Sequence, residues 1–518
     1  MNGMLFFFSL KDIKKEIKNM IRRILQQSFP SVKSNTRLSR CFCTSYQPKN
    51  QSEELNIGQP TPHTHPHLFG GQTECTPCIT HEEYKTRRSK LMQRLSEQHS
   101  LRDFDRHIVV LTANELKIMS NDIPYPFHQD VDFLYLTGLN EPNAIAVLEL
   151  APPNEMDFLL FVQPKDPKRE LWDGAVAGER AAVDYFNADE AFPLSSFTSV
   201  FRDRFKDRKS CIWIKKGKDT NKKNANEISK TFQSNRFSSC SIEDVRMHVQ
   251  RMRVQKSFAE AKMLQASAAI GSRAFQEVIR QTRPGDSEAL PHAVLESQCR
   301  ALGAQYLSFP PVVAGGNRAN TLHYINNDQI LNDGDLVLMD GGCVYHGYAS
   351  DITRTWPVNG HFSKPQARLY DIVLRVLKEC TTRCDGKTSM NSLHGIMLKL
   401  LGQELQQIGL IDSKITKDAE LQRAAGNFCP HHLGHYLGMD THDCPLIHRG
   451  LALTSGMVFT LEPGVYIPES ATDVPREYRG IGIRIEDDVL MTEDGPLVLT
   501  RDLPKEIEDI ENLIASGR

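Results

Sequence analysis

Five short segments in the second half of the sequence place acidic or histidine side chains at the end of apolar runs or in glycine-rich turns. The segments are residues 332–342, 350–356, 431–443, 457–464 and 482–488. A carboxylate at the end of a buried strand loses its hydration, which costs several kcal/mol unless another group compensates the charge. The chain must therefore fold so that these segments meet a compensating partner.

Two divalent cations would compensate such a cluster of charges. Oxygen ligands together with one imidazole suit Mn²⁺, Co²⁺ or Zn²⁺ better than a site built from thiolates would. Two such ions roughly 3.5–4 Å apart can share a water molecule and lower its pKa. A single buried aspartate or histidine is more often a structural group than a metal ligand, but five such segments in one half of the chain favour a metal site.

The local patterns predict where the acidic side chains lie. Asp340 follows the apolar run 336–339, Asp351 lies within a strand-like run, and Glu462 ends another such run directly before a proline. Residues 482–488 alternate between apolar and charged side chains, which predicts that Arg484 and Glu486 share one face of a strand.

The length of 518 residues predicts two or three domains, at about 150 residues per domain. The chain is 40 % hydrophobic and 24 % charged, which is typical of a globular protein. Its net charge of −2 offers no basic field that would hold nucleic acid. We predict an α/β domain over residues 81–241 and an α+β domain over residues 242–518.

Hydrophobic periodicity predicts the elements within these domains. In the first domain we predict a helix over residues 87–98 and strands over 107–112, 133–136, 144–150, 158–162 and 210–214. In the second domain we predict one long helical stretch over residues 245–282, which ends at a Pro-Gly stop signal. Two further helices are predicted over residues 365–385 and 389–408.

The N-terminal region differs from the rest of the chain. The first fifty residues carry ten Lys or Arg against two acidic residues, and their apolar and basic side chains fall on opposite arcs of a helix. This pattern predicts a mitochondrial transit peptide over residues 1–45, and hence a location in the mitochondrial matrix, with a shorter cytosolic form left open. A membrane-surface helix or a disordered basic tail would give the same pattern. The apolar run 4–10 is far shorter than the ~20 residues of a membrane span.

Residues 46–80 are rich in Pro, Gln, Asn and Gly and are predicted to be a linker. Cys75 and Cys78 form the only Cys-x-x-Cys pair of the chain, and a structural zinc site would need a second pair of ligands. We therefore expect reduced cysteines and no structural metal in this region.

The motifs of both domains together resemble a known family. In the second domain they are Met339-Asp340-Gly341-Gly342, Asp351-Ile352-Thr353-Arg354-Thr355, His431…His435…His442, Leu461-Glu462-Pro463-Gly464 and Arg484-Ile485-Glu486-Asp487. They are similar to motifs of the pita-bread metallopeptidases, and within that superfamily to aminopeptidase P of the mitochondrial type. Residues 121–130, 133–138 and 169–174 resemble the N-terminal signature of the same family. The resemblance covers residues 58–515 and implies a pita-bread catalytic domain.

The resemblance also implies a set of metal ligands. It implies that Asp340 holds one metal ion, that His435 and Glu462 hold the other, and that Asp351 and Glu486 bridge both. Mn²⁺ is the metal expected at both positions. No ligand of the set is missing or substituted, which argues against a relative that only binds.

Further roles follow from the same resemblance. His323, His431 and His442 would hold the substrate and stabilise the developing oxyanion. Glu462 would also carry a proton to the leaving nitrogen, and Arg484 would orient a ligating carboxylate.

The implied activity is hydrolysis of the peptide bond before a proline at the second position, by a hydroxide held between two metal ions. The expected partners are peptide and protein N-termini of this kind and a second copy of the chain in a homodimer, with no nucleic acid and no membrane span. A mitochondrial trimming peptidase that removes one residue after presequence cleavage is an alternative with the same site. Prolidase and a catalytically silent binding module are weaker alternatives.

Overall fold

The computed structural model describes residues 56–98, 104–151, 155–206, 208–216 and 240–517. These residues form two compact units, of which the first ends at Met252 and the second begins at Arg253. The predicted transit peptide, residues 1–45, lies outside the described residues. Of the helices that the structure describes, none has the length and apolar character needed to cross a lipid bilayer.

The N-terminal unit contains a six-stranded mixed sheet with helices on both faces. The strands of the unit, including the two short pairs β1-β2 and β4-β5 outside this sheet, are β1 (Glu74–Thr76), β2 (Ile79–Thr80), β3 (Arg106–Thr112), β4 (Ile118–Ser120), β5 (Ile123–Pro124), β6 (Ile145–Ala151), β7 (Glu155–Val162), β8 (Glu190–Pro193), β9 (Ser210–Ile214) and β10 (Ser241–Asp244). Its helices are α2 (His81–Gln98), α3 (Val131–Thr137), α4 (Pro167–Asp173), α5 (Gly178–Asp184), the 3₁₀ helix η1 (Leu194–Ser196), α6 (Phe197–Phe205) and α8 (Arg246–Arg253).

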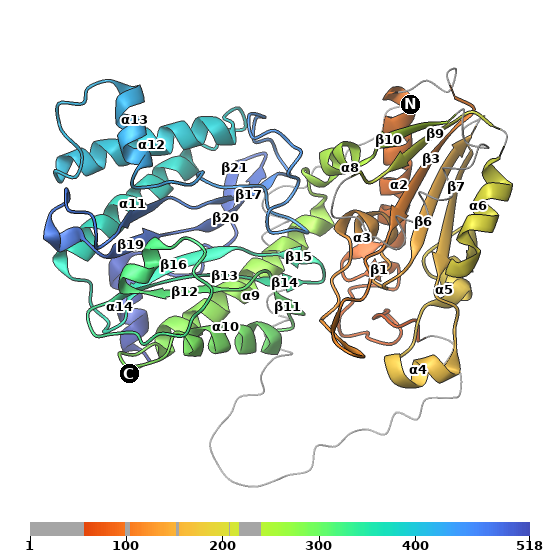
Figure 1. Ribbon diagram of the computed structural model, residues 1–518, viewed down its shortest axis with the longest axis horizontal. Coiled ribbons are helices and arrows are strands. Elements are labelled where there is room, and N and C mark those ends of the chain that lie inside the picture. The colour runs from red at the N-terminus through yellow and green to blue at the C-terminus, as the bar shows by residue number, and fades with distance from the viewer. Residues whose placement is uncertain (1–55, 99–103, 152–154, 207, 217–239, 518) are drawn as a thin grey trace, which may run out of the picture. The chain divides into compact units, whose positions relative to one another are not determined.

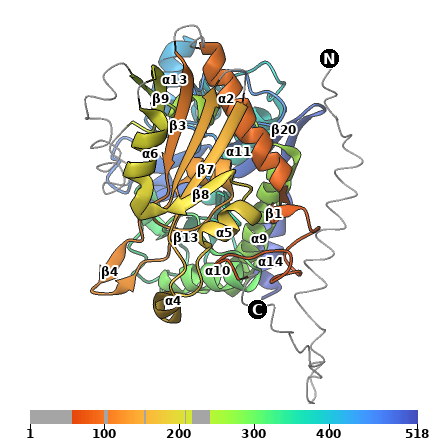
Figure 2. The same ribbon diagram turned by 90° about the vertical axis from the view of Figure 1, so that its right-hand side faces the viewer.

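The six strands run in the order β10-β9-β3-β6-β7-β8. The central pairs β3/β6 and β6/β7 are antiparallel, and the outer pairs are parallel. Helix α6 lies against one face of the sheet, where its Phe197, Phe201 and Phe205 pack on alternate apolar residues of the strands, and α2 lies against the other face (Figure 1). Figure 2 shows the short β4–β5 hairpin extending away from this sheet.

One predicted strand of this unit is wrong. Residues 133–136 belong to helix α3 although Phe133 and Tyr135 favour a strand. The carboxylate of Asp130 accepts hydrogen bonds from the backbone N–H groups of Asp132 and Phe133, and Gly138 ends the helix in the left-handed conformation. The two caps therefore outweigh the propensity of the residues between them.

The start and the end of this unit also differ from the prediction. Residues 56–80, predicted to be a linker, contain β1 and β2 and pack on the unit through buried Ile57, Cys75 and Ile79. The side chain of Gln59 donates a hydrogen bond to the carbonyl of Gly138. At the other end, β10 pairs with β9, so residues beyond the expected boundary at 241 still belong to the first unit.

A buried acid in this unit predicts an unusual pH dependence of stability. Burial raises the pKa of Glu141 from 4.5 to about 7, and its Oε1 has no hydrogen-bond partner among the described residues. Because the folded state binds this proton more tightly than the unfolded chain does, the free energy of unfolding should fall as the pH rises from about 4.5 to 7. We expect Glu141→Gln to be more stable than the parent by about 1–3 kcal/mol at pH 8, a difference that shrinks towards pH 5 in urea titrations. A difference that is the same at both pH values would contradict this assignment.

The C-terminal unit begins before the long helix α9 and contains all five acid-rich segments. Its helices are α9 (Phe258–Gln281), α10 (Ala289–Ala301), η3 (Gly316–Asn320), α11 (Lys364–Thr382), α12 (Met390–Gln407), α13 (Asp418–Gly426), η4 (Arg476–Tyr478) and α14 (Ile507–Ala515). Its strands are β11 (Tyr306–Leu307), β12 (Val312–Gly315), β13 (Leu336–Gly341), β14 (Cys343–Tyr345), β15 (Tyr348–Ala349), β16 (Ile352–Pro357), β17 (Val458–Leu461), β18 (Gly464–Ile467), β19 (Ile481–Arg484), β20 (Asp487–Thr492) and β21 (Gly495–Val498).

Several small antiparallel sheets form the middle of this unit, in the orders β12-β13-β16, β11-β14-β15, β17-β20-β21 and β18-β19. Helices α9, α10 and α14 cover one side of the strands, and α11, α12 and α13 cover the other side (Figure 1). The segments that carry the acidic residues are therefore enclosed between two helical layers.

The predicted long helix over residues 245–282 is in fact two helices, α8 and α9, with a break between them. Ser257 begins α9 with a capping box, in which its side chain and that of Glu260 each bond the other residue's backbone N–H. This Ser-x-x-Glu signal was present in the sequence inside the predicted helix.

Candidate metal centre

A cavity of about 730 Å³ in the C-terminal unit collects all the site residues that the sequence predicted. The predicted residues among its lining are His323, Asp340, Asp351, His431, His435, His442, Glu462, Arg484 and Glu486. They come from segments up to 163 residues apart, so only the tertiary structure brings them together.

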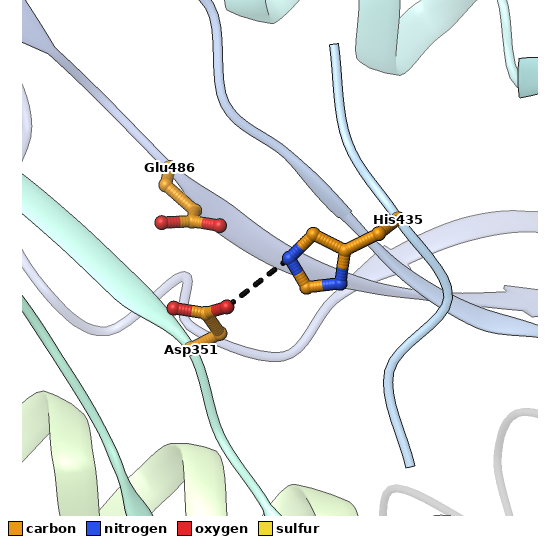
Figure 3. A group of neighbouring side chains, drawn as sticks. All are labelled: Asp351, His435 and Glu486. Atoms are coloured by element: carbon orange, nitrogen blue, oxygen red, sulfur yellow. Dashed lines mark ion pairs between the residues drawn. The ribbon is translucent and has the colours of Figure 1, made fainter. Parts of the chain in front are cut away.

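Asp351, His435 and Glu486 form the tightest cluster within the cavity (Figure 3). One ligand atom of each lies within 4.8 Å of the others, and Asp351 Oδ2 lies 3.2 Å from His435 Nε2. All three residues are buried. Asp340 and Glu462 line the same cavity, and Glu462 Oε1 lies 3.8 Å from His435 Nε2.

Strand ends and turns present these carboxylates, as the sequence predicted in part. Asp340 lies in β13 opposite Thr353 of β16, Asp351 directly precedes β16, and Glu462 directly follows β17. Arg484 and Glu486 both face the cavity, but the expectation that they lie in one strand is wrong, because Arg484 ends β19 and Glu486 lies in the connection to β20.

Arg484 links four of the residues around the cavity. Its Nη2 donates to Asp340 Oδ2 (2.8 Å), its Nη1 to the hydroxyl of Tyr466 (2.9 Å) and its Nε to Thr353 Oγ1 (3.1 Å). The Thr353 hydroxyl in turn donates to Glu486 Oε2 (2.7 Å). Thr353 and Tyr466 are not among the predicted site residues, because a hydroxyl inside an apolar strand carries no signal of its distant partners.

The charge balance of the cavity leaves the carboxylates under-compensated. Burial, and after it the neighbouring carboxylates, raise the pKa values of Asp351 and Glu486 well above their ordinary range. Burial also raises the pKa of Glu462, to about 7. Among the described residues, nothing donates a hydrogen bond to the buried Oδ1 atoms of Asp340 and Asp351. Arg484 and Arg449, the two arginines that line the cavity, therefore leave these two carboxylate oxygens without a donor.

The orientation of the His435 ring also suits a metal ligand. Its Nδ1 lies 3.1 Å from the carbonyl oxygen of Tyr436 and donates a hydrogen bond there. Nε2 is then the ring nitrogen that faces the carboxylate of Asp351, 3.2 Å away, where a metal ion could contact both groups. This is the orientation that a histidine adopts as a metal ligand, and the residues present fit divalent cations with oxygen and imidazole ligands.

Two further histidines are held in their neutral form beside the carboxylates. His431 Nδ1 donates to the carbonyl of His432 (2.9 Å), and Nε2 accepts from the hydroxyl of Tyr466 (2.9 Å). Burial and, after it, Arg484 lower the pKa of His431 to about 4. The ring of His442 lies edge-on to that of His435, with centroids 4.3 Å apart, and burial lowers its pKa as well.

A close backbone contact at Gly434 positions His435. The segment around it pairs with β17, since the N–H of Thr460 donates to the carbonyl of His435 and the N–H of Glu462 to that of Leu433. A Cβ atom at Gly434 would lie 2.0 Å from the backbone oxygen of Thr460. The backbone would have to move, and His435 with it.

We therefore expect Gly434→Ala to lower the free energy of unfolding by about 1–3 kcal/mol and to weaken metal binding. Thermal unfolding with and without Mn²⁺ measures both effects. Gly426→Ala is the matched control, because no heavy atom lies within 4 Å of an added Cβ at that position. Equal metal-induced shifts in Tm for the parent and for Gly434→Ala would contradict the expectation.

Comparison with known proteins identifies the family to which the chain belongs. The profile of metallopeptidase family M24 matches residues 262–493, and that of the aminopeptidase P N-terminal domain matches residues 84–213. Xaa-Pro aminopeptidase 3 of Rattus norvegicus is 43 % identical over 480 residues, which cover 92 % of this chain and 94 % of the rat protein. The chain belongs to the Xaa-Pro aminopeptidases of family M24.

Other members of the family are similar over most of their length. Intermediate cleaving peptidase 55 of Arabidopsis thaliana, a mitochondrial protein by its name, is 38 % identical over 92 % of both chains. The structure of zinc-substituted Escherichia coli aminopeptidase P in complex with product matches with a TM-score of 0.78 and 32 % identity, and covers 85 % of this chain and 99 % of that one. The predicted family, the pita-bread fold and the identification of the chain as a metallopeptidase are thereby confirmed.

Proposed function

We propose that the chain removes the first residue from peptides and proteins whose second residue is proline, at a site that holds two divalent metal ions. The observation that carries this proposal is the cavity in which all the expected ligands and substrate-side histidines lie together. Two of its buried carboxylate oxygens have no partner among the described residues, as expected of ligands.

The proposed ligands divide into three groups. Asp340 would hold one ion, His435 and Glu462 the other, and Asp351 and Glu486 would contact both. The ions would supply Lewis acidity and would lower the pKa of water at the site. We propose Mn²⁺ at both positions, in keeping with four carboxylate ligands and one imidazole.

The protein side chains would bind the peptide and move its protons. His431 and His442, whose pKa values burial lowers, line the cavity together with His323, and all three would hold the carbonyl groups and stabilise the oxyanion as it develops. Glu462, whose pKa burial raises to about 7, would pass a proton to the leaving nitrogen. Arg484 would keep the carboxylate of Asp340 in place through their 2.8 Å contact.

The decisive experiment compares two peptides. Release of the first residue from Arg-Pro-Pro and from Arg-Ala-Pro is measured with the metal-stripped full chain, with and without added Mn²⁺. We expect metal-dependent cleavage of Arg-Pro-Pro and a rate at least ~10-fold lower for Arg-Ala-Pro, since a shaped pocket discriminates small apolar differences by about 10–200-fold. No cleavage of either peptide with any divalent metal would contradict the proposal and favour a binding-only role.

A second candidate function has support from the relatives named intermediate cleaving peptidase 55 in Arabidopsis thaliana, Schizosaccharomyces pombe and Saccharomyces cerevisiae. By this alternative the chain trims one residue from mitochondrial proteins after presequence cleavage, with the same metal site. Equal cleavage of Arg-Pro-Pro and Arg-Ala-Pro would favour it.

We also propose a mitochondrial location and a homodimer. The location rests on the basic, amphipathic pattern of residues 1–45 and on the mitochondrial relatives. Import of the full chain into isolated mitochondria, followed by N-terminal sequencing, tests the transit peptide. Light scattering of the purified protein tests the dimer.

A further inference from the structure

We propose that Glu288, a residue outside the metal centre, is a positioning residue that fixes His323 in the cavity. The proposal rests on the proposed function in one respect, since it takes His323 as a residue that contacts the substrate. Glu288 directly precedes α10, and its side chain is fully buried.

His323 needs an external support because of where it lies. It belongs to the segment 315–330, which continues from the end of β12 through η3 and contributes Leu322, His323 and Ile325 to the lining of the cavity. The residue is exposed, and within the described part of the chain its ring makes no hydrogen bond or ion pair. The position of the ring therefore depends on how firmly the backbone around it is held.

Glu288 holds this segment through four hydrogen bonds, two from backbone N–H groups and two from side chains. Its Oε1 accepts hydrogen bonds from the N–H of Gly315 (2.9 Å) and from Nε of Arg318 (2.6 Å). Its Oε2 accepts from the hydroxyl of Tyr324 (2.8 Å) and from the N–H of Gln329 (3.0 Å). The four donors lie on both sides of His323, and one of them is the residue next to it.

The residues that flank His323 complete the support. Leu322 and Tyr324 pack on an apolar cluster that includes Val312, Leu338 and Tyr466. The bond from Glu288 to the Tyr324 hydroxyl fixes the outer end of this side chain. The buried carboxylate of Glu288 thus connects the start of the segment, its end and Tyr324, which is the neighbour of His323.

The four donors also explain why the residue is an acid. Two N–H groups, a guanidinium and a hydroxyl all point at Glu288, and a carboxylate accepts from all four. A glutamine has the same shape, but its NH₂ group would face at least one donor. Glu288→Gln should therefore loosen the segment without creating a cavity.

We expect Glu288→Gln to lower kcat/KM for Arg-Pro-Pro by about 10–100-fold, which is typical of residues that orient a functional group. The loss should appear in kcat, and the metal content should equal that of the parent. Tyr324→Phe removes a single bond of the four and should lower kcat in the same direction but less. This second variant keeps the test informative if Glu288→Gln does not fold.

The matched control is Glu260→Gln. Glu260 is also a buried acid in the C-terminal unit, and it accepts from the N–H of Ser257 and the hydroxyl of Tyr348. It does not line the cavity. We expect this variant to lower Tm and to leave kcat/KM within about 2-fold of the parent.

A double-mutant cycle with His323→Ala separates positioning from general destabilisation. If Glu288 acts through His323, then Glu288→Gln adds less than about 2-fold to the loss in kcat/KM caused by His323→Ala alone. Losses that multiply in full would overturn the proposal. Full activity of His323→Ala would instead refute the proposed role of His323, and an inactive parent would refute the proposed function itself.

Discussion

Asp351→Asn is expected to abolish most of the peptidase activity and at the same time to stabilise the metal-free protein. Asparagine has the shape of aspartate but is a poor ligand for a divalent cation. A metal ion stabilises the transition state by several kcal/mol, so its loss should lower kcat on the order of 10³-fold. The opposite effect on stability follows from the environment of Asp351. Burial and the nearby carboxylates raise its pKa well above the ordinary range, so its charge is unfavourable without a cation.

Two measurements test this pair of effects. In the presence of EDTA, Asp351→Asn should have a higher Tm than the parent, because the variant no longer buries the charge. With Mn²⁺ the order should reverse, since the parent gains stability from the bound metal in proportion to the logarithm of metal concentration over Kd. Glu493→Gln, at an exposed position of the same unit, serves as the control. A lower Tm of Asp351→Asn in EDTA would show that Asp351 is a structural group.

Arg354→Met is expected to cause the largest loss of stability, about 3–5 kcal/mol, which is typical of breaking a buried ion pair from one side. Arg354 lies in β16 with no exposed side-chain surface, and its Nη2 donates to Asp487 Oδ1 (2.9 Å). Its remaining N–H groups donate to backbone carbonyls, among them those of Thr353 and Glu486. Methionine fills the space but leaves the carboxylate and the carbonyls without these donors.

The loss should be partly reversible. Arg354 and Lys505 lower the pKa of Asp487 to about 2 against the opposing effect of burial, so the carboxylate is charged and depends on both cations. Adding Asp487→Asn to Arg354→Met removes the uncompensated charge and should recover about 1–3 kcal/mol, the cost of a buried polar group without its partner. Urea unfolding of the two variants and the parent measures this recovery. A loss below about 1 kcal/mol for Arg354→Met would contradict the expectation.

Sequence reasoning succeeded where a local pattern carries the chemistry. Each proposed ligand lies in a short motif whose apolar run and turn can be recognised without its partners, as in Asp340-Gly341-Gly342 or Glu462-Pro463-Gly464. The strands β9 and β13 were predicted for the same reason. Helix α3 and the break before α9 differ from the prediction because the capping side chains of Asp130 and Ser257 fix where these helices begin, against the propensity and periodicity of their neighbours.

What only the tertiary structure decided is how distant residues meet. Hydrogen bonds join side chains that lie more than a hundred residues apart in the sequence, in the series Glu486–Thr353–Arg484–Tyr466–His431. Glu288 likewise forms hydrogen bonds with Tyr324 and Gln329, although α10, β11, β12 and η3 lie between them in the sequence. A hydroxyl or a lone acid in such a position has no periodicity and no motif, since its partner is chosen by packing. The sequence by itself indicated the carboxylates and histidines that line the cavity, because each lies in a local motif, and the fold determined which side chains form hydrogen bonds with one another.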